Sequence, residues 1–226
     1  MTTADKDPAP AASTAGRSAR QQRRRDRSRE EILEAARTVL LNKGLSGMTL
    51  EAVAREAGMS KTGLYYYFAS KDALAFELVF AALEGHATAV STAVAGSSAG
   101  GEALGAIVRE TVNTFAPKMD DFRLAFLLGQ VTTSGGVEIS AEQFARIRPL
   151  NDLTLGGAST LLAKDREHGK SGAAVEPRLL AFLAYLSAIG LLTMKGMVEA
   201  QGDPLLYSDE QLIEGFAKVF AKAAKG

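Results

Sequence analysis

The 226-residue chain contains no cysteine and only two histidines. Without cysteine it can form no disulfide framework, and it offers neither a thiolate nucleophile nor a cysteine metal ligand. The two histidines, His86 and His168, are isolated in the sequence and do not suggest a metal site. From these absences we expect no metal and no cofactor.

A hydrophobic run long enough to cross a bilayer is also missing. The most apolar stretch, Leu179 to Met194, has 16 residues before Lys195, short of the roughly 20 that a membrane span requires. We expect it to form a helix buried on nearly all sides within a larger assembly. Residues 1–19 are rich in Ala, Thr, Ser and Pro and lack the apolar segment of a signal peptide. The expected location is the cytoplasm, with no membrane partner.

Charge of neither sign dominates, since 26 Lys or Arg balance 26 Asp or Glu. The charges are nevertheless unevenly placed: residues 1–75 carry 13 basic and 9 acidic side chains, and the remainder carries 13 and 17. A basic N-terminal part suits a phosphate-bearing partner. We interpret residues 1–26 as a disordered basic arm. Its arginines either solubilise the chain or contact phosphates or the minor groove.

Two short helices separated by a glycine are predicted around Gly58. Thr49 can cap the first helix, Gly58 can supply the positive φ that ends it, and Ser60 can cap the second. Leu64 and Phe68, four residues apart, mark the buried side of the second helix. This pattern is typical of a helix-turn-helix that lays its second helix in the major groove of DNA.

The outward side of the second helix carries aromatic and small side chains and little charge. Tyrosine hydroxyls can reach phosphates, and a glycine allows close approach to the groove. The alternative is a surface helix pair whose tyrosines cover a hydrophobic neighbour. The residues expected to face outward are Lys61, Thr62, Gly63, Tyr65 and Tyr67.

Further helices flank this pair. Ser28 and Glu31 have capping-box spacing at the start of a helix that ends near Gly44. Ser70 can cap a fourth helix that begins at Lys71. Three compact helices with a fourth leading away can bury a small core of their own.

Residues 28–79 resemble the DNA-binding domain of the tetracycline-repressor (TetR) family of bacterial transcription regulators. One departure is the order Thr62-Gly63, where the family most often has Gly-Thr. This departure bears on which bases the second helix prefers and not on how the helix docks in the groove. The similarity rests on Ile32–Ala36, Gly44, Thr49, Val53–Ala54, Ala57–Lys61, Leu64–Tyr65, Tyr67–Phe68 and Ser70–Lys71.

The resemblance implies roles for single residues. Thr49, Tyr65 and Lys71 would contact phosphates, the last at a helix N-terminus where amides also favour an anion. Tyr66 would either contact the DNA backbone or pack inside the domain. The groove-facing residues would be Lys61, Thr62, Gly63 and Tyr67. With Ser60, these residues make up the predicted DNA-binding site.

Beyond residue 74 no alternating strand pattern occurs, and the predicted fold is all-α. The capping boxes Ser140–Gln143 and Ser208–Gln211 mark two helix starts. Helices are expected near 71–94, 102–117, 120–133, 140–167, 176–199 and 209–224. The predicted domains are the arm 1–26, the helix-turn-helix domain 27–73, and 74–226, which the resemblance identifies as a helical ligand-binding and dimerisation domain.

The resemblance also implies a homodimer, in which the helix around 179–194 and the last helix form a four-helix interface. A two-fold dimer would present two recognition helices to successive major grooves about 34–36 Å apart. Packing within a monomeric core is the alternative for both helices.

In the family, the middle helices surround a mostly apolar cavity for a small molecule. Each aromatic residue here could equally be ordinary core. The predicted ligand-binding residues are Phe80, Leu83, His86, Phe115, Arg123, Phe126, Gln130 and Phe144.

An enzyme is not expected. Residues Gly96–Gly100 match the Gly-x-Ser-x-Gly pattern, but that motif needs a preceding strand, and a helix is predicted there. We expect a bacterial, cytoplasmic regulator that is nucleoid-associated when bound to DNA. In this interpretation a small molecule releases a repressor from a palindromic operator. The alternatives are a ligand-activated activator and an architectural DNA-binding dimer without a ligand.

Overall fold

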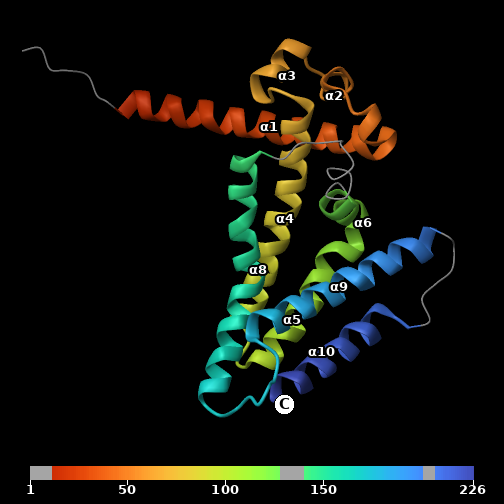
Figure 1. Cartoon of the computed structure of the whole chain (residues 1–226). Coiled ribbons are helices and arrows are strands. Elements are labelled where there is room, and N and C mark those ends of the chain that lie inside the picture. The colour runs from red at the N-terminus through yellow and green to blue at the C-terminus, as the bar shows by residue number, and fades with distance from the viewer. Residues whose placement is uncertain (1–11, 128–139, 201–206) are drawn as a thin grey trace, which may run out of the picture. The chain divides into compact units, whose positions relative to one another are not determined.

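The computed structural model describes residues 12–127, 140–200 and 207–226, and these residues form helices without any strand. The all-α prediction is therefore confirmed. The chain divides into two compact units, Met1–Ala75 and Phe76–Gly226, and helix α4 (Lys71–Ala95) runs from the first into the second (Figure 1).

The first unit consists of three helices and the first turn of α4. These are α1 (Ala12–Gly47), α2 (Leu50–Glu56) and α3 (Lys61–Tyr67). Its core is the apolar side of each helix, which includes the fully buried Ile32 of α1, Val53 of α2 and Leu64 of α3. Burial of one such side chain contributes about 1.5–3 kcal/mol, so a few contacts hold this small unit together.

The start of α1 differs from the prediction. The helix begins at Ala12, so the expected start at Ser28 and the expected disorder of residues 12–26 are both wrong. Alanine, arginine and glutamine have high helix propensity. Side chains four residues apart add contacts, because Gln22 Nε2 donates to Asp26 Oδ1 (2.8 Å). Residues 1–11 lie outside the described part of the chain.

The second unit contains the rest of α4 and the helices that follow it. Most agree with the predicted ranges, but the helix expected over 120–133 is replaced by the short α6 and a π-helical turn, and residues 128–139 lie outside the described part. The elements are α5 (Gly100–Phe115), η1 (Ala116–Lys118), α6 (Met119–Phe122), η2 (Arg123–Leu127), α8 (Ala141–Glu167), α9 (Pro177–Ala200) and α10 (Asp209–Lys225). Both predicted capping boxes are present, at the starts of α8 and α10.

Helix α5 is the centre of the second unit and packs against α8, α9 and α10. Glycines allow the close approach of α10. A Cβ atom at Gly101 would lie 3.1 Å from Ala221 Cα, and one at Gly105 would lie 3.2 Å from Ala217 Cβ. The small residues on both helices thus set the spacing of this pair.

Two described helices, Lys71–Ala95 and Pro177–Val198, are long and apolar enough to cross a membrane by length and composition. Core helices meet the same criterion, and α9 has a core side, where Leu180, Ala184 and Leu192 are buried. The other side of α9 is exposed, so the expected burial on nearly all sides is not met within one chain.

Candidate functional site

The turn between α2 and α3 is held by the predicted caps. The Ala52 amide donates to Thr49 Oγ1 (3.1 Å), and the Gly63 amide donates to Ser60 Oγ (3.1 Å). Gly58 has a φ of 64°, the left-handed conformation that ends α2. The two predicted caps and the predicted turn at Gly58 are thus confirmed.

Gly63 has a local role besides the groove-facing role that sequence reasoning suggested. A Cβ atom at this position would lie 3.2 Å from Ser60 Oγ, the oxygen that accepts from its own amide. The glycine therefore leaves room for a close N-cap. The order Thr62-Gly63 places the small residue where the cap needs it.

The exposed side of α3 carries Lys61, Thr62, Tyr65 and Tyr66. Tyr66 is 66% exposed, whereas Tyr67 is partly buried and packs edge-on against Tyr66, with ring centroids 5.3 Å apart. The outward position expected for Tyr67 is thus met only in part. Leu64 lies on the buried side of α3. Tyr67, three residues later, lies on nearly the same side of the helix and is therefore partly buried.

Lys61 bridges the two helices of the motif. Its ammonium group forms an ion pair with Glu51 of α2, and it lies 5.8 Å from the Tyr65 ring centroid. The hydrogen bond from Lys61 lowers the pKa of Glu51, and the same contact raises the pKa of Lys61. Both side chains are solvent-exposed, so a phosphate or a base edge can compete with Glu51 for Lys61.

The other predicted contacts flank this side. Thr49 is exposed, and the partly buried Lys71 begins α4, where the Ala73 amide donates to Ser70 Oγ (3.0 Å). The start of α4 therefore combines backbone amides with a lysine, a combination that suits a phosphate.

Sequence reasoning missed a contact between α1 and α3. The Arg25 guanidinium lies 5.3 Å from the ring centroid of Tyr66, and that of Arg29 lies 4.8 Å from the ring centroid of Phe68. Arg25 of the expected arm and Arg29 just after the arm thus stack on aromatic residues at the C-terminal end of α3. The sequence contains no local signal for this contact, since it depends on how α1 crosses α3.

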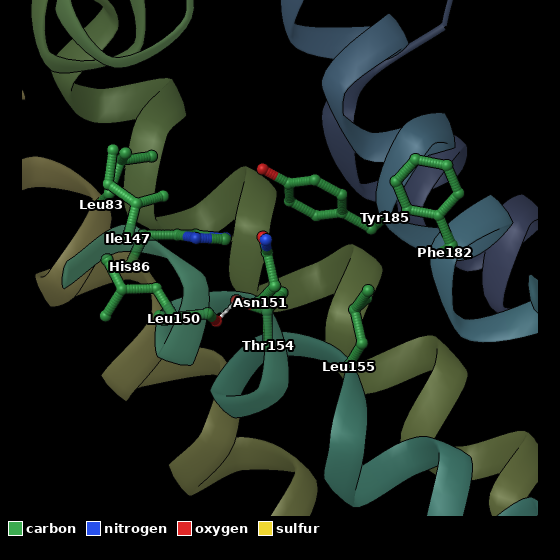
Figure 2. Close-up of a pocket in the computed structure, with 10 residues that line it drawn as sticks. Leu83, His86, Ile147, Leu150, Asn151, Thr154, Leu155, Phe182 and Tyr185 are labelled. Atoms are coloured by element: carbon green, nitrogen blue, oxygen red, sulfur yellow. Dashed lines mark hydrogen bonds between the residues drawn. The ribbon is translucent and has the colours of Figure 1, made fainter. Parts of the chain in front are cut away.

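The second unit contains a cavity of about 50 Å³ between α4, α8 and α9 (Figure 2). The walls are mostly aliphatic and aromatic. The lining residues are Leu83, His86, Ala87, Ile147, Leu150, Asn151, Thr154, Leu155, Phe182 and Tyr185. Figure 2 shows His86 from α4, Asn151 from α8 and Tyr185 from α9 turned toward the same space.

Of the predicted ligand-binding residues, Leu83 and His86 line this cavity. Phe115 and Phe126 lie behind it: the Phe115 ring stacks on His86 at 5.0 Å, and Phe126 lies 6.4 Å from Tyr185.

The remaining predicted ligand-binding residues do not line the cavity. Phe80 stacks on Phe76 at 5.8 Å, Arg123 pairs with Asp120 at 3.1 Å, and Phe144 is 57% exposed. The structure does not bring these three residues to the cavity, because an apolar or polar residue type does not reveal which way its helix faces. Gln130 lies outside the described residues.

The predicted set of ligand-binding residues contained none of the cavity residues of α8 and α9. Five of them recur at spacings of three and four along one side of α8, which was a usable signal. The residues from α8 are Ile147, Leu150, Asn151, Thr154 and Leu155. For Phe182 and Tyr185 of α9 the sequence held no comparable signal, because nearly every neighbour is apolar.

His86 is the most buried polar group at the cavity, with 2% of its surface exposed. Its Nε2 atom lies 3.0 Å from Thr111 Oγ1 of α5. Burial lowers the pKa of His86 to about 4 and raises the pKa of Tyr185. Both side chains are therefore uncharged near neutral pH.

The Gly-x-Ser-x-Gly match lies in the turn between α4 and α5, with no strand before it in this part of the structure. Ser98 Oγ donates to Glu102 Oε2 (2.9 Å), and the Ser98 amide donates to the same oxygen (2.7 Å). The serine is held by Glu102 just before α5 and lacks the strand–turn–helix setting of a nucleophile.

Comparison with known proteins agrees with the helix-turn-helix geometry. Residues 32–78 match the sequence model of the family described as bacterial regulatory proteins, tetR family. A Bacillus subtilis protein, the uncharacterized HTH-type transcriptional regulator YfiR, is 44% identical over 48 residues, which are 21% of this chain and 23% of the relative. The aligned part thus spans about a quarter of that relative.

Solved structures share the fold over most of the chain. A TetR/AcrR-family transcriptional regulator from Thermobifida fusca is 21% identical, with a TM-score of 0.65 over 87% of this chain and 97% of that one. The FadR regulator of Bacillus subtilis in complex with stearoyl-CoA is 14% identical, with a TM-score of 0.65 over 86% and 98%.

The helix-turn-helix geometry and the match over residues 32–78 identify the first unit as a DNA-binding domain of the kind found in transcriptional regulators. The first unit resembles the DNA-binding domain of the TetR family, and residues 32–78 are the part that matches the family's sequence model.

Proposed function

We propose that the chain is a homodimeric repressor that binds a palindromic operator and is released from it by a small molecule. The observation that carries the DNA-binding part is the helix-turn-helix with four exposed polar or aromatic side chains on α3. The predicted DNA contacts remain those of the sequence analysis, with Tyr66 now favoured for an outward role by its 66% exposure.

The exposed side of α9 supports the homodimer. Six large apolar side chains there are 39–55% exposed, and they recur at helical spacing. We call them the α9 face: Leu179, Phe182, Leu183, Leu186, Met194 and Met197. An apolar stripe of this length indicates a protein contact, and a two-fold contact would carry one recognition helix on each subunit toward successive major grooves.

The cavity supports the response to a ligand. It is smaller than the 300–1,000 Å³ that is typical of ligand pockets, so a ligand of ordinary size would have to part α4, α8 and α9. The binding of stearoyl-CoA by the structurally similar FadR makes a similar use of this fold reasonable. Since α4 continues into the first unit at Lys71, displacement of α4 would change the DNA-binding unit. The chain would then have two arrangements of α4 and the DNA-binding unit. Ligand and DNA would oppose each other, because each would bind a different one of these arrangements more tightly.

The decisive experiment selects genomic DNA fragments with the purified chain and footprints the tightest one. A protected palindrome in a promoter supports the regulator. Weak, salt-sensitive binding without a preferred site supports the architectural alternative instead. A ligand that strengthens binding to the palindrome would support the activator.

The dimer is tested separately by sedimentation of Leu186→Glu. A charge in the α9 face should convert the dimer to a folded monomer. Thr160→Glu is the matched control because Thr160 is exposed on α8. An unchanged dimer in Leu186→Glu would exclude the α9 face as the interface.

A further inference from the structure

The walls of the cavity contain no charged side chain among the described residues. The groups able to form hydrogen bonds are His86, Asn151, Thr154 and Tyr185. Thr154 is already used, because its hydroxyl donates to the Leu150 carbonyl (2.9 Å; dashed line in Figure 2). A ligand would therefore meet mainly His86, Asn151 and Tyr185 as polar partners.

The contact with Thr111 fixes where the proton of neutral His86 resides. Thr111 is completely buried. Helix threonines such as Thr92 and Thr154 donate to the carbonyl four residues earlier, but within the described chain the Thr111 hydroxyl contacts only His86 Nε2. A buried hydroxyl proton needs an acceptor, so the Thr111 hydroxyl donates to Nε2. Since a neutral imidazole carries one proton, that proton is on Nδ1.

His86 Nδ1 opens toward the cavity. It has no hydrogen-bond partner in the part of the chain that the structure describes, yet no fully buried side-chain nitrogen or oxygen there is without a partner. Nδ1 is therefore not sealed inside the protein, and the cavity is the space that the His86 ring lines. The structure thus presents an N–H donor to a ligand.

We propose that the cavity takes an uncharged, largely apolar molecule with a carbonyl or ether oxygen that accepts a hydrogen bond from His86 Nδ1. This inference deepens the proposed function and rests on it. The apolar walls favour a hydrophobic body, and the Tyr185 hydroxyl is a second donor, since burial keeps it protonated. A carboxylate would lose its hydration without gaining a cation, which costs several kcal/mol.

The test uses the full-length chain and three single-ring probes of similar size: acetophenone, ethylbenzene and benzoate. Histidine labelling with ¹⁵N gives two side chains to follow, and His168→Gln assigns them. In the free protein the His86 nitrogens should report the Nδ1–H tautomer. Acetophenone should shift the Nδ1 signal and bind about threefold to tenfold more tightly than ethylbenzene, as expected for one hydrogen bond.

Benzoate should bind at least about tenfold more weakly than acetophenone. Equal or tighter binding of benzoate, equal binding of ethylbenzene, or no binding of either uncharged probe would overturn the proposal. An Nε2–H tautomer in the free protein would overturn it as well.

Thr111→Val tests the positioning role of Thr111 with little change of shape. It removes the donor to Nε2, so His86 should populate both tautomers and the preference for acetophenone over ethylbenzene should fall. His86→Leu, which removes the donor, should abolish the preference for acetophenone over ethylbenzene. These titrations contain no DNA, so their failure is distinguishable from failure of the proposed operator binding.

Discussion

The Arg146 guanidinium of α8 makes a two-point contact with the Glu77 carboxylate of α4, at 2.5 Å for Nη1–Oε1 and 3.2 Å for Nη2–Oε2. The same guanidinium lies 5.0 Å and 4.2 Å from the ring centroids of Phe76 and Phe80. The Arg146 side chain thus combines a bidentate ion pair with stacking on two aromatic rings. It ties the start of α8 to α4 one residue before Ile147, which lines the cavity.

Arg146→Lys should lower the free energy of unfolding by about 1 kcal/mol, because an ammonium group keeps the charge but loses the fork and the stacking. Denaturant unfolding measures this loss. Arg148→Lys, at an exposed position two residues later in α8, should change little. Equal effects of the two substitutions would contradict the role of Arg146.

His86 should make stability depend on pH. Its pKa is about 4 in the folded chain, against an ordinary value of 6.5, because burial disfavours the charged ring. Between these values the unfolded state binds the proton and the folded state does not. The contribution of neutral His86 to the free energy of unfolding is complete above pH 6.5 and falls by about 3 kcal/mol as the pH drops to 4.

Urea unfolding at several pH values between 4 and 7 checks this dependence. His86→Gln should remove this part of the slope, whereas His168→Gln, on the exposed surface, should keep it. The same slope in both variants would show that other groups cause it.

Substitutions in the first unit should separate phosphate contacts from base contacts. Tyr65→Phe and Lys71→Ala should weaken binding to operator and unrelated DNA alike, and Lys71→Ala should reduce the salt slope by about one. Lys61→Ala should change the preferred operator. Binding isotherms at several salt concentrations measure these effects, and equal losses on both DNAs for all three variants would contradict the assignment.

The basic part of α1 should add to DNA affinity. Arg25 lies against Tyr66, so Arg24→Ala/Arg25→Ala should weaken binding and lower the salt slope by up to about two. Arg109→Ala, an exposed change in the second unit, is the control for net charge. An unchanged salt slope would show that these arginines only solubilise the chain.

Glycine substitutions should report how tightly α5 packs. A Cβ atom at Gly100 would lie 2.5 Å from Leu162 Cδ2, so Gly100→Ala should destabilise by about 1–3 kcal/mol. At Gly156, inside α8, nothing lies within 4 Å, and Gly156→Ala should stabilise by about 0.5–1 kcal/mol. Thermal unfolding measures the change in stability of each variant, and packing predicts that the two changes have opposite signs.

Features that depend on a few neighbouring residues were predictable from the sequence. The caps at Thr49 and Ser60 and the turn at Gly58 each involve groups within three residues, so spacing alone identifies them. The N-terminal half of α1 was mispredicted because composition marks an arginine-rich segment as disordered, although its side-chain pairs support a helix. The cavity was predicted only in part. It arises where three helices meet, and one helix's pattern does not report the faces of the other two.

Phe182 lines the cavity and also belongs to the α9 face. A second copy seated on that face would touch the same side chain that an effector touches. The two binding events would then be thermodynamically linked, and each would change the equilibrium constant of the other by the same factor. The apparent affinity for the effector would accordingly vary with protein concentration.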